Sequence, residues 1–213
     1  MDIYECNQPG VIALTFDDGP APATSAILDT LKAKAANATF YVVGDMFNGV
    51  VGPTSRTDLV RRAYAEGHMI GIHDTTHADL TSLSAAELTS HMTTMKSLIE
   101  AAIGKTPRYM RCPYGYYNDN VLSVLAAQNL RHTHWTMDPR DWEDRDTAAT
   151  LDKIDGFLNT VTISSPGSII LLHDTYDETA AAVRPIIDKI RAKGLKLVTV
   201  AECMNDKDGA YVA

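Results

Sequence analysis

The chain has 213 residues, 45% of them hydrophobic, and no stretch rich in Pro, Gly or Ser divides it. A chain of this length can bury a sizeable core, so we expect one domain over residues 1–213. The formal charge of −8 argues against a nucleic-acid partner, because a phosphate backbone is bound by clustered Lys and Arg side chains. No apolar run reaches the roughly 20 residues that a membrane span requires, and the first ten residues do not form a signal peptide.

Seven apolar, β-rich runs alternate with helical segments along the chain. The predicted strands cover residues 11–16, 38–43, 68–73, 108–112, 132–136, 168–173 and 195–201. The predicted helices cover residues 23–35, 84–103, 118–128, 147–159 and 178–193. This alternation indicates a parallel sheet, and strands that are apolar on both faces indicate a sheet covered all round. We therefore expect an α/β fold, a distorted (β/α) barrel of seven or eight parallel strands, with an open doubly wound sheet as the alternative.

Two adjacent carboxylates, Asp17 and Asp18, follow the first predicted strand. Gly19 and Pro20 come next and break the strand, so the pair stands at a strand's carboxyl end, where parallel α/β proteins place their chemistry. Side chains alternate along a strand, so these two acids can converge only through the turn. An ordinary turn with a capping acid is the alternative on these residues alone.

Two histidines, His73 and His77, stand at the end of the third predicted strand. At this spacing they lie on one face of a helical turn and can hold one metal ion through imidazole nitrogens. The string also resembles the His-Glu-x-x-His pattern of metalloproteases with Asp74 in the Glu place, but that pattern requires a long helix and residues 69–72 predict a strand. An accidental pair of surface histidines is the remaining alternative.

Further candidate site residues follow three later strands on the same side of the expected barrel. They are Arg111 and Tyr114 after the fourth strand, Asp141 and Trp142 after the fifth, and Leu171 and His173 at the end of the sixth. By alternation, Leu171 and His173 point the same way, which puts an apolar wall beside an ionisable ring. Further histidines and one tryptophan carry no such pattern and are expected to be ordinary core or rim residues: His68, His91, His132, His134 and Trp135.

The three cysteines are Cys6, Cys112 and Cys203. Cys6 precedes the first predicted strand and Cys203 follows the last, so a bridge between them could form if these strands are neighbours in a closed barrel. Three unrelated thiols in a reducing cytosol are the alternative. Residues 37–39, Asn-Ala-Thr, form a glycosylation acceptor sequence, which fits a secreted protein but often arises by chance.

Five short motifs together resemble those of the polysaccharide deacetylases, carbohydrate esterase family four, in order and approximate spacing. They are Thr-Phe-Asp-Asp-Gly at 15–19, His-x-x-x-His at 73–77, Arg-x-Pro-Tyr at 111–114, Asp-x-x-Asp-Trp at 138–142 and Leu-x-His at 171–173. The match runs from about residue 11 to residue 203 and is greatest to fungal chitin deacetylases, which also carry one cysteine before the first strand and one in a Val-x-Glu-Cys-like ending. The resemblance implies a distorted barrel with a metal site at its C-terminal face, and it favours the bridge between Cys6 and Cys203.

The resemblance also assigns roles to individual residues of this sequence. It implies that Asp18, His73 and His77 hold a divalent metal, most often zinc, with cobalt or another divalent ion as the alternative. It implies that Asp17 is the general base that accepts a proton from water and that His173 is the acid that protonates the leaving amine. The remaining implied roles are orientation of Asp17 by Arg111, orientation and charging of His173 by Asp141, oxyanion binding by the N–H of Tyr114, and an acetyl pocket walled by Trp142 and Leu171.

Two neighbours of His73 depart from the family pattern. Ile72 stands where Asn is usual, and Asp74 stands where Ser or Thr is usual. We predict that Asp74 is a loop clamp that accepts backbone N–H bonds. The alternative is a further carboxylate close to the ion, which would make the metal a weaker Lewis acid.

The function implied by the resemblance is removal of acetyl groups from N-acetylglucosamine units of chitin or chito-oligosaccharides by a secreted, monomeric, metal-dependent enzyme of the extracellular space or cell wall. Peptidoglycan N-acetylglucosamine deacetylase and acetylxylan esterase are the nearest enzyme alternatives, because they share the motifs. A catalytically weakened carbohydrate-binding protein is the alternative of another class. A metalloprotease is a more distant one.

Overall fold

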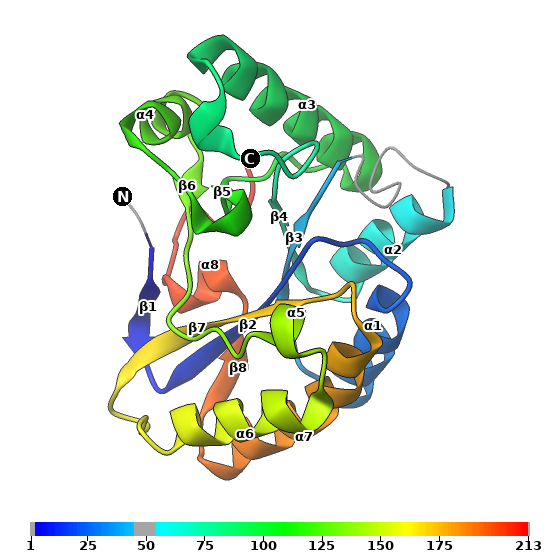
Figure 1. The fold of residues 1–213 in the computed structure, drawn as a ribbon, viewed down its shortest axis with the longest axis vertical. Helices are drawn as coiled ribbons and strands as arrows, with labels where there is room; N and C mark the ends of the chain where they lie inside the picture. The colour runs from blue at the N-terminus through cyan, green and yellow to red at the C-terminus, as the bar shows by residue number, and fades with distance from the viewer. Residues whose placement is uncertain (1–2, 45–53, 213) are drawn as a thin grey trace.

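The computed structural model describes residues 3–44 and 54–212. Its strands are β1 (Glu5–Pro9), β2 (Val11–Asp17), β3 (Thr39–Val42), β4 (Met69–Ile72), β5 (Tyr109–Met110), β6 (Arg131–His132), β7 (Pro166–His173) and β8 (Lys196–Val198). They form one curled sheet in the order β1-β7-β2-β3-β4-β5-β6 (Figure 1). On the edge of β2 opposite β7, β8 pairs with the first residues of β2 and β3 with the last. The predicted first and last strands, β2 and β8, are therefore neighbours.

The ladders among β2 to β8 are all parallel, which confirms the predicted (β/α) barrel of seven parallel strands. Past β6 the sheet closes only through isolated bridges, Ile3 with Thr133 and Met137 with Ile170, so the barrel is distorted. The added strand β1 runs antiparallel to β7, which makes the whole sheet mixed. Strand β1 was not predicted, because its residues, Glu-Cys-Asn-Gln-Pro, are mostly polar and exposed.

Helices cover the outside of the curled sheet (Figure 1). They are α1 (Thr24–Ala33), α2 (Thr54–Ala65), α3 (Ala85–Ile103), α4 (Asp119–Ala127), α6 (Thr147–Leu158) and α7 (Asp177–Ala192), with the short helices α5 (Asp141–Asp144) and α8 (Val200–Cys203) and the 3-10 turns η2 (Leu80–Ser82) and η3 (Pro113–Gly115). None of the described helices is both long and apolar enough to cross a membrane. The five predicted helices are present, and α2, which is rich in charged residues, was not predicted.

Helix α3 shows how local sequence sets these boundaries. Ser84 caps its first turn, and Glu87 accepts a bond from the Ser84 N–H, so the two residues form a capping box. Gly104 ends the helix in the left-handed conformation, with φ of 69°. The predicted strand over residues 195–201 is too long, because β8 ends at Val198. Thr199 then caps α8 and forms a second capping box with Glu202.

Strand β2 separates two hydrophobic layers by the alternation of its side chains. Ile12, Leu14 and Phe16 pack in the large core between sheet and helices. Val11 and Ala13 belong to the smaller core inside the barrel. The next residues of this inner face are Thr15 and Asp17, both buried, so the same alternation carries a carboxylate to the carboxyl end of the barrel interior.

The predicted bridge between Cys6 and Cys203 is present as a disulfide with a Cα–Cα distance of 4.9 Å. It links β1 to the end of α8, so it closes 197 residues of separation around the barrel. Cys112 is buried and takes no part in the disulfide.

Candidate active site

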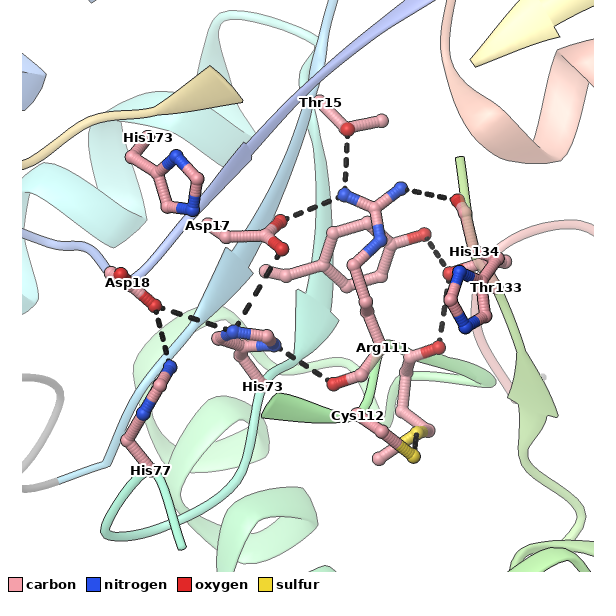
Figure 2. A network of polar contacts seen from close by, with 12 residues as sticks. Thr15, Asp17, Asp18, His73, His77, Arg111, Cys112, Thr133, His134 and His173 are labelled. Atoms are coloured by element: carbon pink, nitrogen blue, oxygen red, sulfur yellow. Dashed lines mark hydrogen bonds and ion pairs between the residues drawn. The ribbon is translucent and has the colours of Figure 1, made fainter. Parts of the chain in front are cut away.

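The polar residues of the predicted motifs meet at the carboxyl ends of the parallel strands (Figure 2). Asp17 is the last residue of β2, and the left-handed backbone of Asp18, with φ of 75°, turns the second carboxylate away from the strand direction. Gly19 then passes close to a buried carboxyl group, because a Cβ atom there would lie 2.1 Å from Oδ2 of Asp174. The two acids converge through this turn, as the strand-end argument predicted.

Asp18, His73 and His77 form the only group in the described part of the chain with the composition and geometry to hold a metal ion. Oδ1 of Asp18 lies 3.3 Å from Nε2 of His73 and 3.1 Å from Nε2 of His77. Ligands of one tetrahedral zinc ion lie about 3.3 Å apart when each bond is about 2.0–2.1 Å long. That oxygen is buried and accepts no hydrogen bond, so a cation fits the three residues.

The remaining contacts of His73 fix which nitrogen faces the site. Its Nδ1 lies 2.8 Å from the carbonyl oxygen of Arg111, so Nδ1 carries the proton and donates it there. The lone pair of Nε2 is therefore directed toward Asp18, which is the arrangement that a metal-ligating histidine requires.

The electrostatics of this group favour positive charge between its members. Burial would raise the pKa of Asp18, but the adjacent imidazoles of His73 and His77 outweigh it and hold that pKa well below its usual range. Burial likewise would lower the pKa of His73, but the charges of Asp17 and Asp18 raise it. A cation at this point would supply the same compensation without protonating the imidazoles.

The segment between the two histidines is not helical, which corrects the expected placement of both rings on a helical turn. His73 follows β4 directly, and His77 sits in a loop with φ of 60°. Oδ2 of Asp74 accepts the N–H groups of Thr76 at 3.2 Å and Ala78 at 3.0 Å. Asp74 is thus a loop clamp, as predicted, and it is not among the residues that could share an ion. Without a helix, the metalloprotease pattern has no structural basis here.

Asp17 is held by Arg111, the largest fully buried side chain in the described part of the chain. Nη1 of Arg111 donates to Oδ1 of Asp17 at 2.9 Å and to Oγ1 of Thr15 at 2.7 Å (Figure 2). Nη2 donates to the carbonyl oxygen of His134, and the guanidinium stacks on the ring of Tyr41 at 4.5 Å. The other carboxylate oxygen of Asp17 stays 3.8 Å from Nε2 of His73, beside the candidate metal position.

His173 lies on the other side of the acids and is held by Asp141. Nδ1 of His173 is 2.8 Å from Oδ1 of Asp141, while Oδ2 of Asp141 accepts the N–H of His173 and the hydroxyl of Thr179. Burial alone would lower the pKa of His173, but the bond and charge of Asp141, with the charges of Asp17 and Asp18, raise it to about 9. The ring is therefore charged at neutral pH.

These groups open into a pocket of about 490 Å³. Its wall includes Tyr114, Trp142 and Leu171 from the predicted set. Arg111 and Asp141 do not line the pocket but bond to two residues that do, Asp17 and His173. The ring of Tyr114 packs edge-on against His77 at 4.6 Å. A larger hollow of about 730 Å³ includes Met69, at the amino end of β4, in its wall and shares none of these residues.

Six further residues line the pocket and were not predicted as site residues: Cys112, Gly115, Tyr116, Trp135, Asp138 and Tyr176. Trp135 was expected in the core, and it packs on the inner hydrophobic cluster while also reaching the pocket. Asp138 stands in a quoted motif, and its Oδ2 accepts the indole N–H of Trp142 at 3.4 Å. The available sequence signal for Tyr116 was its place as an aromatic residue two positions after the motif residue Tyr114. In the structure Tyr116 is 57% exposed.

Known proteins match this chain in sequence and in fold. The sequence model of the family described as "Polysaccharide deacetylase" matches residues 4–133. A chitin deacetylase of Pestalotiopsis sp is 39% identical over 206 residues, which cover 96% of this chain and 67% of that protein. A peptidoglycan-N-acetylmuramic acid deacetylase of Bacillus subtilis, PdaC, is 36% identical over 90% of this chain and 38% of its own length. The solved structure of the chitin deacetylase from Colletotrichum lindemuthianum matches with a TM-score of 0.91 and 32% identity, covering 99% of this chain and 95% of that one.

Proposed function

Because this chain belongs to the polysaccharide deacetylase family, we propose that it hydrolyses the N-acetyl group of N-acetylglucosamine units in chitin or chito-oligosaccharides and releases acetate. The observation that carries the proposal is one pocket in which a three-residue cation site, a carboxylate, Asp17, and a charged histidine, His173, lie together. A base and an acid within reach of one reacting carbonyl are what amide hydrolysis requires.

The cation site is proposed to hold a divalent metal, most often zinc, through Asp18, His73 and His77. Two imidazoles and one carboxylate are the ligand set of a catalytic rather than a structural zinc site. When bound, such an ion polarises a carbonyl and makes water more acidic. Nε2 of His73 can coordinate this ion, because Nδ1 is the nitrogen that donates a hydrogen bond to the carbonyl oxygen of Arg111.

Asp17 is proposed as the general base that accepts a proton from the attacking water. Arg111 fixes this carboxylate through Oδ1 and leaves Oδ2 directed toward the cation site. Because the Arg111 side chain is fully buried and also bonded to Thr15 and His134, Asp17 has little freedom to move while it accepts the proton.

His173 is proposed as the general acid that protonates the leaving nitrogen. Asp141 holds the imidazolium by Nδ1, which leaves the Nε2 proton to be donated. The backbone N–H of Tyr114 is proposed to donate to the oxyanion, and Trp142 and Leu171 to enclose the acetyl methyl group in the pocket wall.

We further propose that the protein acts outside the cell or in the cell wall, as a monomer and without a nucleic-acid partner. The disulfide between Cys6 and Cys203 fits an oxidising compartment. The net charge of −8 fits a neutral polysaccharide better than a polyanion.

Acetate release from a panel of chitin oligomers, peptidoglycan and acetylated xylan tests the proposal. We expect chitin oligomers to be the preferred substrates, turnover to stop after chelation, and zinc or cobalt to restore it. Preference for peptidoglycan or acetylated xylan would replace the substrate with one of the alternatives. Retention on chitin with no acetate from any substrate, in protein shown to contain metal, would identify a carbohydrate-binding protein instead.

A further inference from the structure

Residues 73–78, the loop that carries both candidate histidine ligands, have little regular structure to hold them. The loop leaves β4 at Ile72 and reaches η2 at Leu80. Two of its residues, Asp74 and His77, adopt positive φ angles of 90° and 60°. Such conformations are unfavourable for residues other than Gly and persist only where surrounding contacts impose them. The position of His77 therefore depends on the contacts that restrain this loop.

The carboxylate of Asp74 supplies restraint from inside the loop. One oxygen, Oδ2, accepts the backbone N–H groups of Thr76 and Ala78, on either side of His77. The side chain of Asp74 is completely buried. A buried carboxylate is stable only when both of its oxygens are paired, so the second oxygen requires a donor from elsewhere.

That donor is His91 of helix α3. Its Nδ1 lies 2.8 Å from Oδ1 of Asp74. Helix α3 is itself firmly placed, because the capping box fixes its start and Met92 and Met95, next to and one turn after His91, are fully buried in the main core. A second, longer contact joins the same two segments, from the hydroxyl of Thr75 to the carbonyl oxygen of His91 at 3.4 Å.

We infer that His91 is a positioning residue for the metal site, which through Asp74 ties the loop bearing His73 and His77 to helix α3. The inference rests on the proposed metal site and adds a residue outside the five motifs. His91 is not among the three candidate ligands and acts by holding the carboxylate that clamps the loop. The Ser or Thr usual at position 74 carries no charge, so it has no need of such a partner; the substitution by Asp makes His91 necessary.

A double-mutant cycle in zinc affinity tests this coupling, using His91→Ala, Asp74→Ser and the double variant. Affinity is measured by competition with a chromophoric chelator in metal-depleted full-length protein. We expect His91→Ala to weaken zinc binding about 10-fold, the lower end of the effect of removing partners that orient ligands. In the Asp74→Ser background the same change should weaken binding less than about 2-fold, because no buried carboxylate is left without its partner. Equal losses in both backgrounds, or none in either, would overturn the inference.

Matched variants separate positioning from general damage to the fold. His91→Asn places its amide nitrogen as many bonds from Cα as Nδ1 and should keep affinity near that of the parent, whereas His91→Gln extends past that position and should behave like His91→Ala. This comparison decides the matter even if His91→Ala fails to fold. Lys96→Ala removes a different tether of α3, the bond to the carbonyl oxygen of Gln128, and should lower the melting temperature without changing zinc affinity. If the parent protein binds no zinc, the metal site itself is refuted. If the parent binds zinc only as tightly as His91→Ala does, the metal site stands and the inference about His91 is overturned.

Discussion

Replacing Asp141 by Asn tests whether the charge of this carboxylate keeps His173 in its acid form. In the parent, both oxygens of Asp141 accept bonds, one from the ring of His173 and the other from the backbone N–H of the same residue and the hydroxyl of Thr179. An Asn side chain has only one acceptor oxygen. If the oxygen faces the ring, the amide NH₂ faces a backbone donor; if it is reversed, the NH₂ faces Nδ1 and opposes the imidazolium.

The size of the effect follows from the pKa of His173. The pKa is about 9 because the bond and charge of Asp141, with Asp17 and Asp18, outweigh burial, which acts in the opposite direction. Without Asp141 the pKa should return to about 6.5 or below. At pH 8 the protonated fraction then falls from roughly 90% to roughly 3%, a loss of about 30-fold in the competent acid form. At pH 6 the same change should cost less than about 2-fold through protonation.

The sign of the shift fixes the direction of the pH profile. A raised pKa extends the protonated form upward, so activity in the parent should persist above neutrality and fall as pH rises toward 9. A cation at Asp18 cancels the contribution of that carboxylate, so the alkaline limb of the loaded enzyme should lie somewhat below 9. The Asp141→Asn limb should lie about two pH units lower still.

The assay is kcat/KM for acetate release from a chitin oligomer between pH 5 and pH 10, with metal content measured in each sample. Asp144→Asn is the matched control, because Asp144 lies on the same short helix but pairs with Lys153. This control should keep the parent profile. An Asp141→Asn enzyme whose rate is reduced equally at every pH would show that Asp141 only positions the ring, and the argument from charge would be wrong.

Three further changes follow from the same structure. Asp17→Asn should keep stoichiometric zinc and lose nearly all turnover, while Asp18→Asn should lose zinc as well; equal zinc loss by elemental analysis would contradict the division of roles. Replacing Cys6 and Cys203 by Ser should lower the free energy of unfolding in urea by up to about 5 kcal/mol, since the bridge closes 197 residues, and a change below about 1 kcal/mol would refute this. Gly19→Ala should destabilise the protein by about 1–3 kcal/mol, because its Cβ would lie 2.1 Å from a carboxylate oxygen; an unchanged melting temperature would show that the turn can yield.

Much of the fold could be predicted because its signal is local. Strand β2 has seven consecutive buried residues, and α3 carries its capping box and buried stripe within its own sequence. Strand β1 could not be predicted, since it forms by pairing with β7 about 160 residues away and buries only one of its five side chains fully. The distortion of the barrel is also non-local, because isolated bridges, not ladders, complete the circuit.

The candidate site divides in the same way. The residues of the motifs were predicted because they follow predicted strands, and most of them line one pocket. Arg111 and Asp141 do not line it but bond to Asp17 and His173, which do. The shape of the loop after His73 was predicted wrongly as a helical turn, since spacing alone does not distinguish a turn of helix from a clamped loop. The difference depends on Asp74, whose backbone N–H donors are local, and on His91, whose contribution is not visible from its position 17 residues later in a helix.

The alternation in β2 explains how Asp17, the proposed general base, can be buried and still reach the pocket. Val11, Ala13, Thr15 and Asp17 occupy one face, which is apolar at the bottom of the barrel and becomes polar only in its last two positions. Arg111 lies against those two positions and satisfies both side chains at once. Tyr41 and the carbonyl oxygen of His134 position the guanidinium of Arg111. The barrel interior therefore fixes Arg111, and Arg111 in turn fixes Asp17. A substitution that loosens this interior, far from the pocket surface, should therefore reduce turnover more than it reduces metal binding. Arg111 holds Asp17 in place, whereas the turn that follows the strand places Asp18.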